Sequence, residues 1–394
     1  MGNKGSSEAK PTLQARIETS GEHVTIMWEV YAEDGKTWQP YKVTLEDLQR
    51  ASDATLNRLK ELEACDWLDI SGAEVRPLLL NLAEAGIRQY EVLMTGADND
   101  DKSQKNAHDF REWFEKNVAP NSSEWRIQIV HHQYNAPLIS WGLTFTPIPD
   151  KDLRNLSTDW NDYQNFWANG FKLACRGALL HEADRLPHLI KDFEAKIAIT
   201  VEVSDEELLE HHNALDAEDQ LEGGEKIANS VRLFEMLSKK YEEHNMFWYV
   251  SLEREDNSYV VDDDELTLAS IQKARDGTNK IFVMFFDGDS VLRSKRGARW
   301  VNEMLDKGRT GMISAEVDIR NKQLTYFGWE FLKHTIYAQK PLIAAVHEAR
   351  EAYWPRSLLY GVYCDPLHIY FEPPPANDVT MADGFLKSVK SLRQ

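Results

Sequence analysis

The segment Ile281-Phe-Val-Met-Phe-Phe286-Asp-Gly-Asp-Ser290 joins six consecutive apolar residues to two carboxylates separated by one glycine. A short apolar run bounded by turn residues predicts a buried strand, and we expect one over Lys280–Phe286. The carboxyl ends of such strands are where α/β sheets place their sites. Asp287 and Asp289 are therefore candidate site residues.

Strands and helices alternate on both sides of this segment. Apolar runs rich in Val, Ile, Phe, Tyr and Trp predict strands, and the amphipathic stretches between them predict helices. The alternation indicates an α/β fold with a mostly parallel sheet. The expected strands are His23–Tyr31, Tyr90–Thr95, Trp125–His131, Lys196–Val203, Phe247–Leu252, Lys280–Phe286, Thr310–Val317 and Leu367–Phe371. The expected helices are Leu45–Cys65, Ala73–Ala85, Ala107–Val118, Ser230–His244, Leu266–Arg275, Ala298–Lys307, Tyr326–Tyr337 and Leu342–Trp354.

Individual residues predict where some of these helices begin and end, and one polar stretch predicts a loop. Thr44 is a good N-cap for the helix that follows it, and Gly86 is expected to end the helix that begins at Ala73. The polar stretch at 143–162 is expected to be a long surface excursion.

The strand–helix series runs twice along the chain. Residues 21–195 form the first α/β half and residues 196–372 the second. Residues 1–20 are small and polar, which predicts a disordered tail. Residues 373–394 begin with three prolines and are expected to form a C-terminal tail with one short helix.

The composition excludes several classes of partner. The chain has 65 Asp and Glu against 45 Lys and Arg, a net charge of −20. Phosphates would be repelled at long range, so nucleic acid and anionic membrane surfaces are not expected as the main partner. Three widely spaced cysteines suit a reducing cytoplasm. The apolar runs are strand-sized and the first residues lack a signal-peptide core, so no membrane association is expected.

Most of the surplus negative charge lies in two stretches. Glu202–Glu225 contains ten acidic residues and no Lys or Arg, and Glu253–Glu265 contains seven acidic residues and one Arg. Such runs are usually solvated loops, and the alternative is a docking surface for a basic partner. Both flank the strand expected over Phe247–Leu252.

The carboxylate pair Asp287 and Asp289 resembles the first motif of the haloacid-dehalogenase-type phosphotransferases. In that family the first Asp is the nucleophile, the second is a general acid–base, and Mg²⁺ neutralises the phosphate. The motif normally opens the domain, whereas here it lies deep in the chain. A Mg²⁺-dependent phosphohydrolase is one alternative, and a polar turn after a buried strand is the other.

Longer blocks occur over residues 20–372, and together they resemble the CHAT family of caspase-like peptidases, relatives of caspase and separase. The blocks are IQIVHHQYNAPLISWGLTF (127–145), GFKLACRGA (170–178), SVRLFEMLSKKYEEHNMFWYVSLE (230–253), ELTLASIQKARDGTNKIFVMFFDGDS (265–290), GMISAEVDIRN (311–321), YFGWEFLKHTIYAQKPLIAAVHEAR (326–350) and PRSLLYGVYCDPLHIYF (355–371). The resemblance implies a caspase-like parallel-sheet sandwich in two tandem halves, a pseudo-caspase half followed by a caspase-like half. It also implies structural roles for a set of block residues, Pro137, Trp141, Tyr360, Tyr363, Asp365 and Pro366.

The catalytic residues of that family have no counterpart here. In active members one strand ends in a His-Gly pair and the next in Cys. The corresponding positions are Leu252 and Asp287, and residues 245–290 contain neither His nor Cys. Cysteine-peptidase chemistry needs a thiolate beside an imidazole, so no catalytic residue, metal or cofactor is expected. The polar residues at these strand ends are candidates for a relict cleft or for an acidic cleft that binds a cation or a basic peptide: Ser251, Glu253, Asp287 and Asp289.

The resemblance implies a catalytically inactive pseudopeptidase that binds, regulates or scaffolds other proteins in a prokaryotic immune or cell-death system such as antiviral defence. The expected partner is another protein, either basic or an operon-encoded protease or effector, and an oligomer is compatible with this role. The alternative within the family is an active peptidase with a non-standard site. Cys364 and His368 have a spacing that such a site could use.

Overall fold

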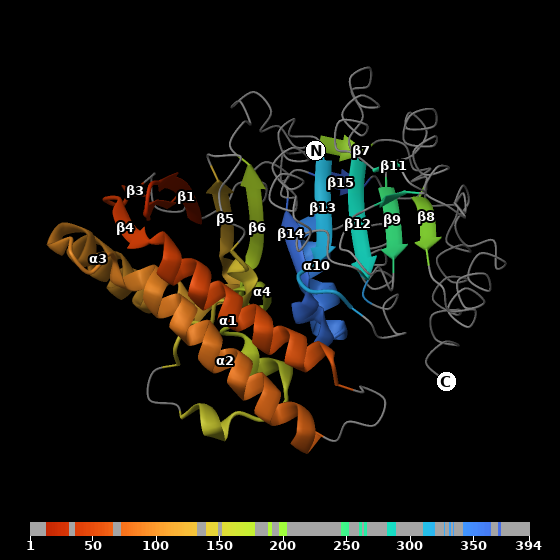
Figure 1. Cartoon of the computed structure of the whole chain (residues 1–394), viewed down its shortest axis with the longest axis horizontal. Coiled ribbons are helices and arrows are strands. Elements are labelled where there is room, and N and C mark those ends of the chain that lie inside the picture. Colours follow the sequence, from red (N-terminus) through yellow and green to blue (C-terminus); the bar gives the residue numbers. More distant parts are fainter. Residues whose placement is uncertain are drawn as a thin grey trace, which may run out of the picture.

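The fold combines helices with one long mixed sheet (Figure 1). The computed structural model describes residues 13–30, 36–65, 72–131, 139–148, 152–177, 188–190, 197–202, 246–251, 260–261, 264–265, 282–288, 310–319, 327, 331, 334, 342–363 and 369–371. The helices expected at 230–244, 266–275, 298–307 and in the C-terminal tail lie outside these residues.

Strands from both halves of the chain lie in a single 11-stranded sheet. Across it the order is β3 (Lys36–Thr37), β2 (His23–Val30), β1 (Leu13–Ser20), β5 (Arg126–His131), β6 (Lys172–Gly177), β14 (Tyr360–Tyr363), β13 (Thr310–Ala315), β12 (Phe282–Gly288), β9 (Met246–Ser251) and β8 (Ile197–Glu202), with β4 (Tyr41–Thr44) paired to β2. Two small sheets pair β10 (Val260–Val261) with β11 (Asp264–Glu265), and β7 (His188–Ile190) with β15 (Ile369–Phe371).

Two parallel groups of strands meet at one antiparallel joint. Strands β1, β5, β6 and β14 run parallel to one another, and so do β13, β12, β9 and β8. The joint is the antiparallel pair β13–β14, and β2 adds antiparallel pairs at the far edge. The sheet is therefore mixed. Because β14 belongs to the second half of the chain and pairs with β6 of the first, the two halves share one sheet.

The first strand corrects the prediction of a disordered tail over residues 1–20. Leu13–Ser20 form β1, which pairs with β2 on one side and β5 on the other. Its sequence LQARIETS reads as polar, yet Leu13, Ala15 and Ile17 are buried because pairing on both edges places the strand inside the sheet. The prediction is wrong for these eight residues.

The helices α1 (Leu45–Glu63), α2 (Gly72–Thr95) and α3 (Asp101–Asn117) follow the first strands and lie together in Figure 1. Leucines at helical spacing place one face of α1 in the core: Leu48, Leu56, Leu59 and Leu62. Thr44 is the N-cap of α1 by backbone position, without a side-chain bond. The Asp100 side chain caps α3 by accepting a 3.0 Å hydrogen bond from the Ser103 amide.

Helix α2 corrects two predictions. Residues Tyr90–Thr95 are helical and not a strand, and Gly86 lies inside the helix instead of ending it. The apolar run at 90–95 fits both a strand and a helix. Its buried residues Leu93 and Met94 lie three and four positions after the buried Tyr90, which is the spacing of one helix face. A Cβ at Gly86 would lie 2.5 Å from the Leu143 carbonyl oxygen, so this glycine serves a close backbone approach.

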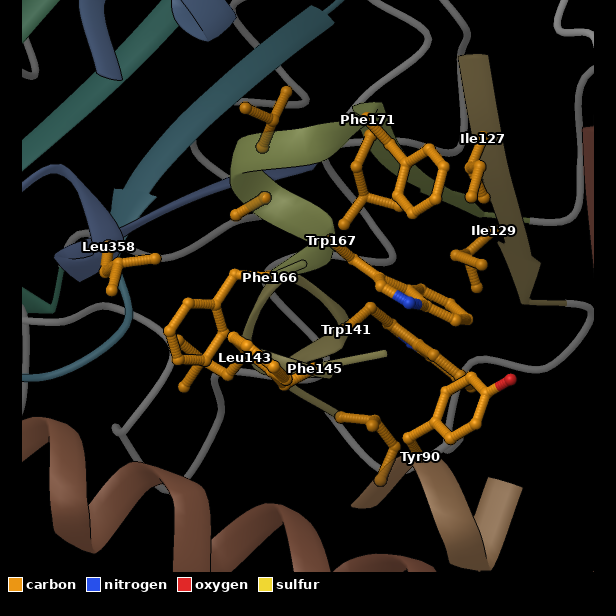
Figure 2. Close-up of a cluster of buried hydrophobic side chains, with 14 of the residues drawn as sticks. Tyr90, Ile127, Ile129, Trp141, Leu143, Phe145, Phe166, Trp167, Phe171 and Leu358 are labelled. Carbon is orange, nitrogen blue, oxygen red and sulfur yellow. The ribbon is translucent and has the colours of Figure 1, made fainter. Parts of the chain in front are cut away.

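The start of the segment 143–162 lies in the core, which corrects part of the predicted surface excursion, while most of residues 152–162 are exposed or half-buried. Leu143, Phe145 and Leu156 are buried, and the segment continues into α4 (Trp167–Gly170). Figure 2 shows Phe145 and Phe166 among the core side chains, and their rings meet edge to face at 4.8 Å. Short 3-10 turns accommodate its polar residues: η2 (Trp141–Leu143), η3 (Leu153–Asn155) and η4 (Trp160–Tyr163).

Candidate functional site

The carboxyl ends of three parallel strands meet at one edge of the sheet. In the register of β8, β9 and β12, Glu202 pairs with Ser251 and Ser251 pairs with Gly288. Asp287 is level with Val250, one residue before the end of β9. The structure therefore brings together the backbone positions of Ser251 and Asp287, while Leu252, Glu253 and Asp289 lie outside the described residues.

Both acidic stretches begin at or just after strand ends at this same edge. The first begins at Glu202, the last residue of β8, and the second begins at Glu253, two positions after the last residue of β9. Parallel strands place successive chain exits on one side of the sheet. Here the chain leaves the carboxyl ends of β8, β9 and β12, at Glu202, Ser251 and Gly288. We call these three strand ends the acidic edge.

Strand β13 continues this edge and introduces a buried carboxyl group. Phe286 of β12 pairs with Ser314, the last pair between these strands, and Glu316 follows two residues after Ser314. Glu316 is 4 % exposed. Local sequence patterns do not single out Glu316, because it lies inside an apolar run that predicts a strand through Val317. The one charged residue inside that run was the available signal.

The Glu316 carboxyl group accepts two side-chain hydrogen bonds from distant segments. Ser140 Oγ donates to Oε2 at 2.9 Å, and the Tyr363 hydroxyl donates to Oε1 at 2.6 Å. The Glu316 amide also donates to the Leu359 carbonyl at 2.6 Å. A buried carboxyl group is costly unless donors satisfy its oxygens, so these contacts hold three segments in one arrangement.

Further hydrogen bonds extend from Ser140 into α1 and α2. The Ser140 amide donates to Ser52 Oγ at 3.1 Å, and its carbonyl accepts from Gln89 Nε2 at 3.1 Å. Gln89 Nε2 also donates to Thr144 Oγ1 at 2.9 Å, and Gln89 Oε1 accepts from Thr55 Oγ1 at 3.0 Å. Every one of these residues is buried. We call the connected set the Glu316 network: Ser52, Thr55, Gln89, Ser140, Thr144, Glu316 and Tyr363.

A second buried polar contact joins the two halves. Arg350, on α10 (Leu342–Ala352), is 3 % exposed and donates to the Ala168 carbonyl at 2.6 Å and the Tyr360 carbonyl at 2.7 Å. The first acceptor lies on α4 and the second on β14, so the guanidinium bridges the halves with a geometry that its planar fork allows.

His347 lies one turn before Arg350 on α10. Burial, and then the positive charge of Arg350, lower the pKa of the His347 imidazole from 6.5 to about 4. The imidazole is therefore neutral near pH 7, and its ring meets Trp160 edge to face with centroids 6.5 Å apart. This arrangement suits a packed core histidine.

Three of the six block residues that the resemblance singles out are buried in the core, and the other three lie outside the described residues. Trp141 is buried in η2, beside Tyr90 and Trp167 in Figure 2. Tyr360 is buried and stacks on Phe327 with ring centroids 4.2 Å apart. Tyr363 belongs to the Glu316 network. Pro137, Asp365 and Pro366 lie outside the described residues.

The surroundings of the Cys65 thiol disfavour its nucleophilic thiolate form. Burial, with Glu74 and Glu63 nearby, raises the pKa of the Cys65 thiol and so lowers its thiolate fraction. Cys364 and His368 lie outside the described residues. Within the described ranges, no group of three or more His, Cys, Asp or Glu side chains is placed to hold a metal ion. None of the helices described combines the length and apolar character needed to cross a membrane.

No protein-family model and no curated protein matches this chain.

Proposed function

We propose that this chain is a catalytically inactive CHAT-like pseudopeptidase that binds a basic protein at the acidic edge and acts as a regulatory or scaffolding subunit. The proposed setting is a prokaryotic immune or cell-death system. One observation carries the binding role. The two acidic stretches begin at or just after the ends of β8 and β9, and the end of β12 lies beside that of β9.

The same edge argues against peptidase chemistry. Adjacent parallel strands ending at Ser251 and Gly288 resemble the pair of strands that carries His and Cys in active caspase-like peptidases. Here residues 245–290 supply neither side chain. A carboxylate such as that of Asp287 is a poor nucleophile toward an amide, so the positions that correspond to the family's catalytic pair lack the groups that cleave.

The charge of this edge fits a cationic ligand. Glu202–Glu225 and Glu253–Glu265 contain seventeen acidic residues against one Arg. Opposite charges steer association and set orientation, and the attraction between exposed charges weakens as salt rises. A basic partner would therefore bind more weakly at high ionic strength.

The binding test uses a fluorescent oligo-arginine peptide as the probe. Replacing Glu253, Glu255 and Asp256 with their amides should weaken binding about 10-fold at low salt, because acidic side chains near the contact supply the attraction. The matched control replaces the exposed acids Glu74, Glu84 and Glu91 of α2 with Gln, which changes net charge equally. Equal weakening by both sets would show binding to net charge alone and would overturn the proposal.

The activity test uses the purified full chain. We expect no cleavage of a peptide-substrate panel and no turnover of generic phosphate esters in Mg²⁺. Amidase activity that is lost on alkylating Cys364 would instead support the peptidase alternative. Mg²⁺-dependent phosphatase turnover that is lost in Asp287→Asn would support the phosphohydrolase alternative. Either result would contradict an inactive binding subunit.

A further inference from the structure

We infer that the Glu316 network couples the acidic edge to helices α1 and α2, so that a ligand at the edge changes the stability of the helices. This inference rests on the proposed function, because it assigns a regulatory output to the surface proposed to bind the partner. The starting point is that β12 pairs with β13 through Phe286 and Ser314, and that Ser314 lies two residues before Glu316. Any displacement of the β12 end acts directly on its hydrogen-bonded neighbour.

Buried hydrogen bonds hold the Glu316 carboxyl group in the arrangement observed. Its oxygens accept from Ser140 and Tyr363 at 2.9 and 2.6 Å in a buried site. A shift that lengthens either bond leaves a buried acceptor short of its donor, which is unfavourable until a new partner is found. Close-packed, hydrogen-bonded sites respond to small displacements by switching between arrangements.

Ser140 is the link between the halves. Its hydroxyl donates to Glu316, while its amide and carbonyl bond Ser52 on α1 and Gln89 on α2. A displacement of the Ser140 hydroxyl therefore acts on both α1 and α2 through the backbone of the same residue. Gln89 then bonds Thr55, which closes the connection between the two helices.

The segment that follows Ser140 is hydrogen-bonded to α2 and α4. The Phe145 amide donates to the Gly86 carbonyl at 3.1 Å, and Gly86 has no Cβ to keep the two backbones apart. Thr146 Oγ1 accepts from Trp167 Nε1 at 3.0 Å further along. The hydroxyl of Thr146 is buried in the same segment but lies outside the Glu316 network, so it offers a matched control.

The first experiment needs no ligand and measures amide hydrogen exchange by mass spectrometry in the full chain. Ser140→Ala should speed exchange about 10-fold in the peptides that contain Gly288 and Ala315–Val317, because loss of one buried hydrogen bond is worth roughly one decade in the local opening equilibrium. Glu316→Gln should have the same effect with less change of shape. Thr146→Val should leave those peptides unchanged. Unchanged exchange in Ser140→Ala, or equal acceleration in Thr146→Val, would overturn the inference.

The second experiment adds the oligo-arginine peptide at saturation. In the unsubstituted chain the probe should slow exchange at the acidic edge and also in α2 around Gln89. In Ser140→Ala the edge should still respond while α2 does not. A response of α2 that survives Ser140→Ala would overturn the coupling. Absence of protection at the edge would instead overturn the proposed function, and the first experiment would still decide the coupling.

Discussion

The hydroxyl of Tyr363 reaches the Glu316 carboxyl group by lying over Gly361, two residues earlier on the same strand face. A Cβ at Gly361 would lie 2.6 Å from Cε2 of Tyr363 and would also collide with the Glu316 carboxyl oxygen. The glycine is thus required by the hydrogen bond that ends the Glu316 network. Because Gly361 has no side chain, Tyr363 on the same strand can donate a hydrogen bond to the buried Glu316 carboxyl group.

Gly361→Ala should destabilise the chain by about 1–3 kcal/mol, since an added methyl must displace the Tyr363 ring and Glu316 from a close-packed site. Gly21→Ala is the comparison, because a Cβ there meets nothing within 4 Å and only the φ of 59° is unfavourable. Urea denaturation measures both free energies of unfolding. A larger loss in Gly21→Ala would mean that the sheet around Gly361 relaxes freely.

Tyr363→Phe should lower the free energy of unfolding by about 1–3 kcal/mol, because it leaves a buried carboxyl oxygen without its donor. Tyr163→Phe is the control, since the hydroxyl of the buried Tyr163 donates at 3.1 Å to the carbonyl of the half-buried Ser157, so that no carboxyl group loses a donor. We expect a smaller loss there, measured by the same denaturation series. Equal losses would argue that the Glu316 oxygen finds another donor.

Stability should fall between pH 6.5 and pH 4 through His347. Burial lowers the folded-state pKa of His347 to about 4 from the ordinary 6.5, so the unfolded chain takes up its proton first as pH falls. The difference amounts to about 3 kcal/mol of stability, fully present above pH 6.5 and lost by pH 4.

His347→Gln should flatten that part of the stability–pH curve. His108→Gln is the control, because His108 is exposed on α3 beside Glu112. Thermal unfolding from pH 7.5 to pH 4 gives the two slopes. If His347→Gln kept the slope of the unsubstituted chain, the imidazole would be exposed to solvent in the folded state.

Arg350→Met should cost about 2–4 kcal/mol, because the Ala168 and Tyr360 carbonyls lose a charged donor that serves both halves. Arg350→Lys should recover only part of this, since one ammonium cannot reproduce the two-armed geometry. Chemical denaturation followed by tryptophan fluorescence reports the loss. Full recovery by Lys would show that charge alone matters at this position.

Local sequence patterns predicted much of the fold. The strands β2, β5, β8, β9, β12 and β13, and the helix α1, lie within two residues of their predicted bounds. The errors share one cause. The polar-looking Leu13–Ser20, the ambiguous Tyr90–Thr95 and the buried start of the 143–162 segment each depend on contacts with distant residues, which override local preference.

The candidate site could be predicted only in outline. The sequence placed Ser251 and Asp287 at strand ends, and the register shows that those ends are neighbours. Glu316 and Ser140 were missed, because their relationship spans 176 residues and no local pattern marks two residues that far apart as partners. Arg350 was missed as a bridge for the same reason.

The sequence by itself determined which side chains are present. It supplies alternating strands and helices, and it places neither His nor Cys in residues 245–290. Tertiary structure alone decided that β14 lies between β6 and β13, that the strand ends at Glu202 and Ser251 are neighbours, and that the Glu316 carboxyl group accepts hydrogen bonds from both halves. The physical reason is range. Strand and helix patterns reflect neighbours a few residues away, whereas strand order and buried hydrogen bonds depend on which distant segments pack together.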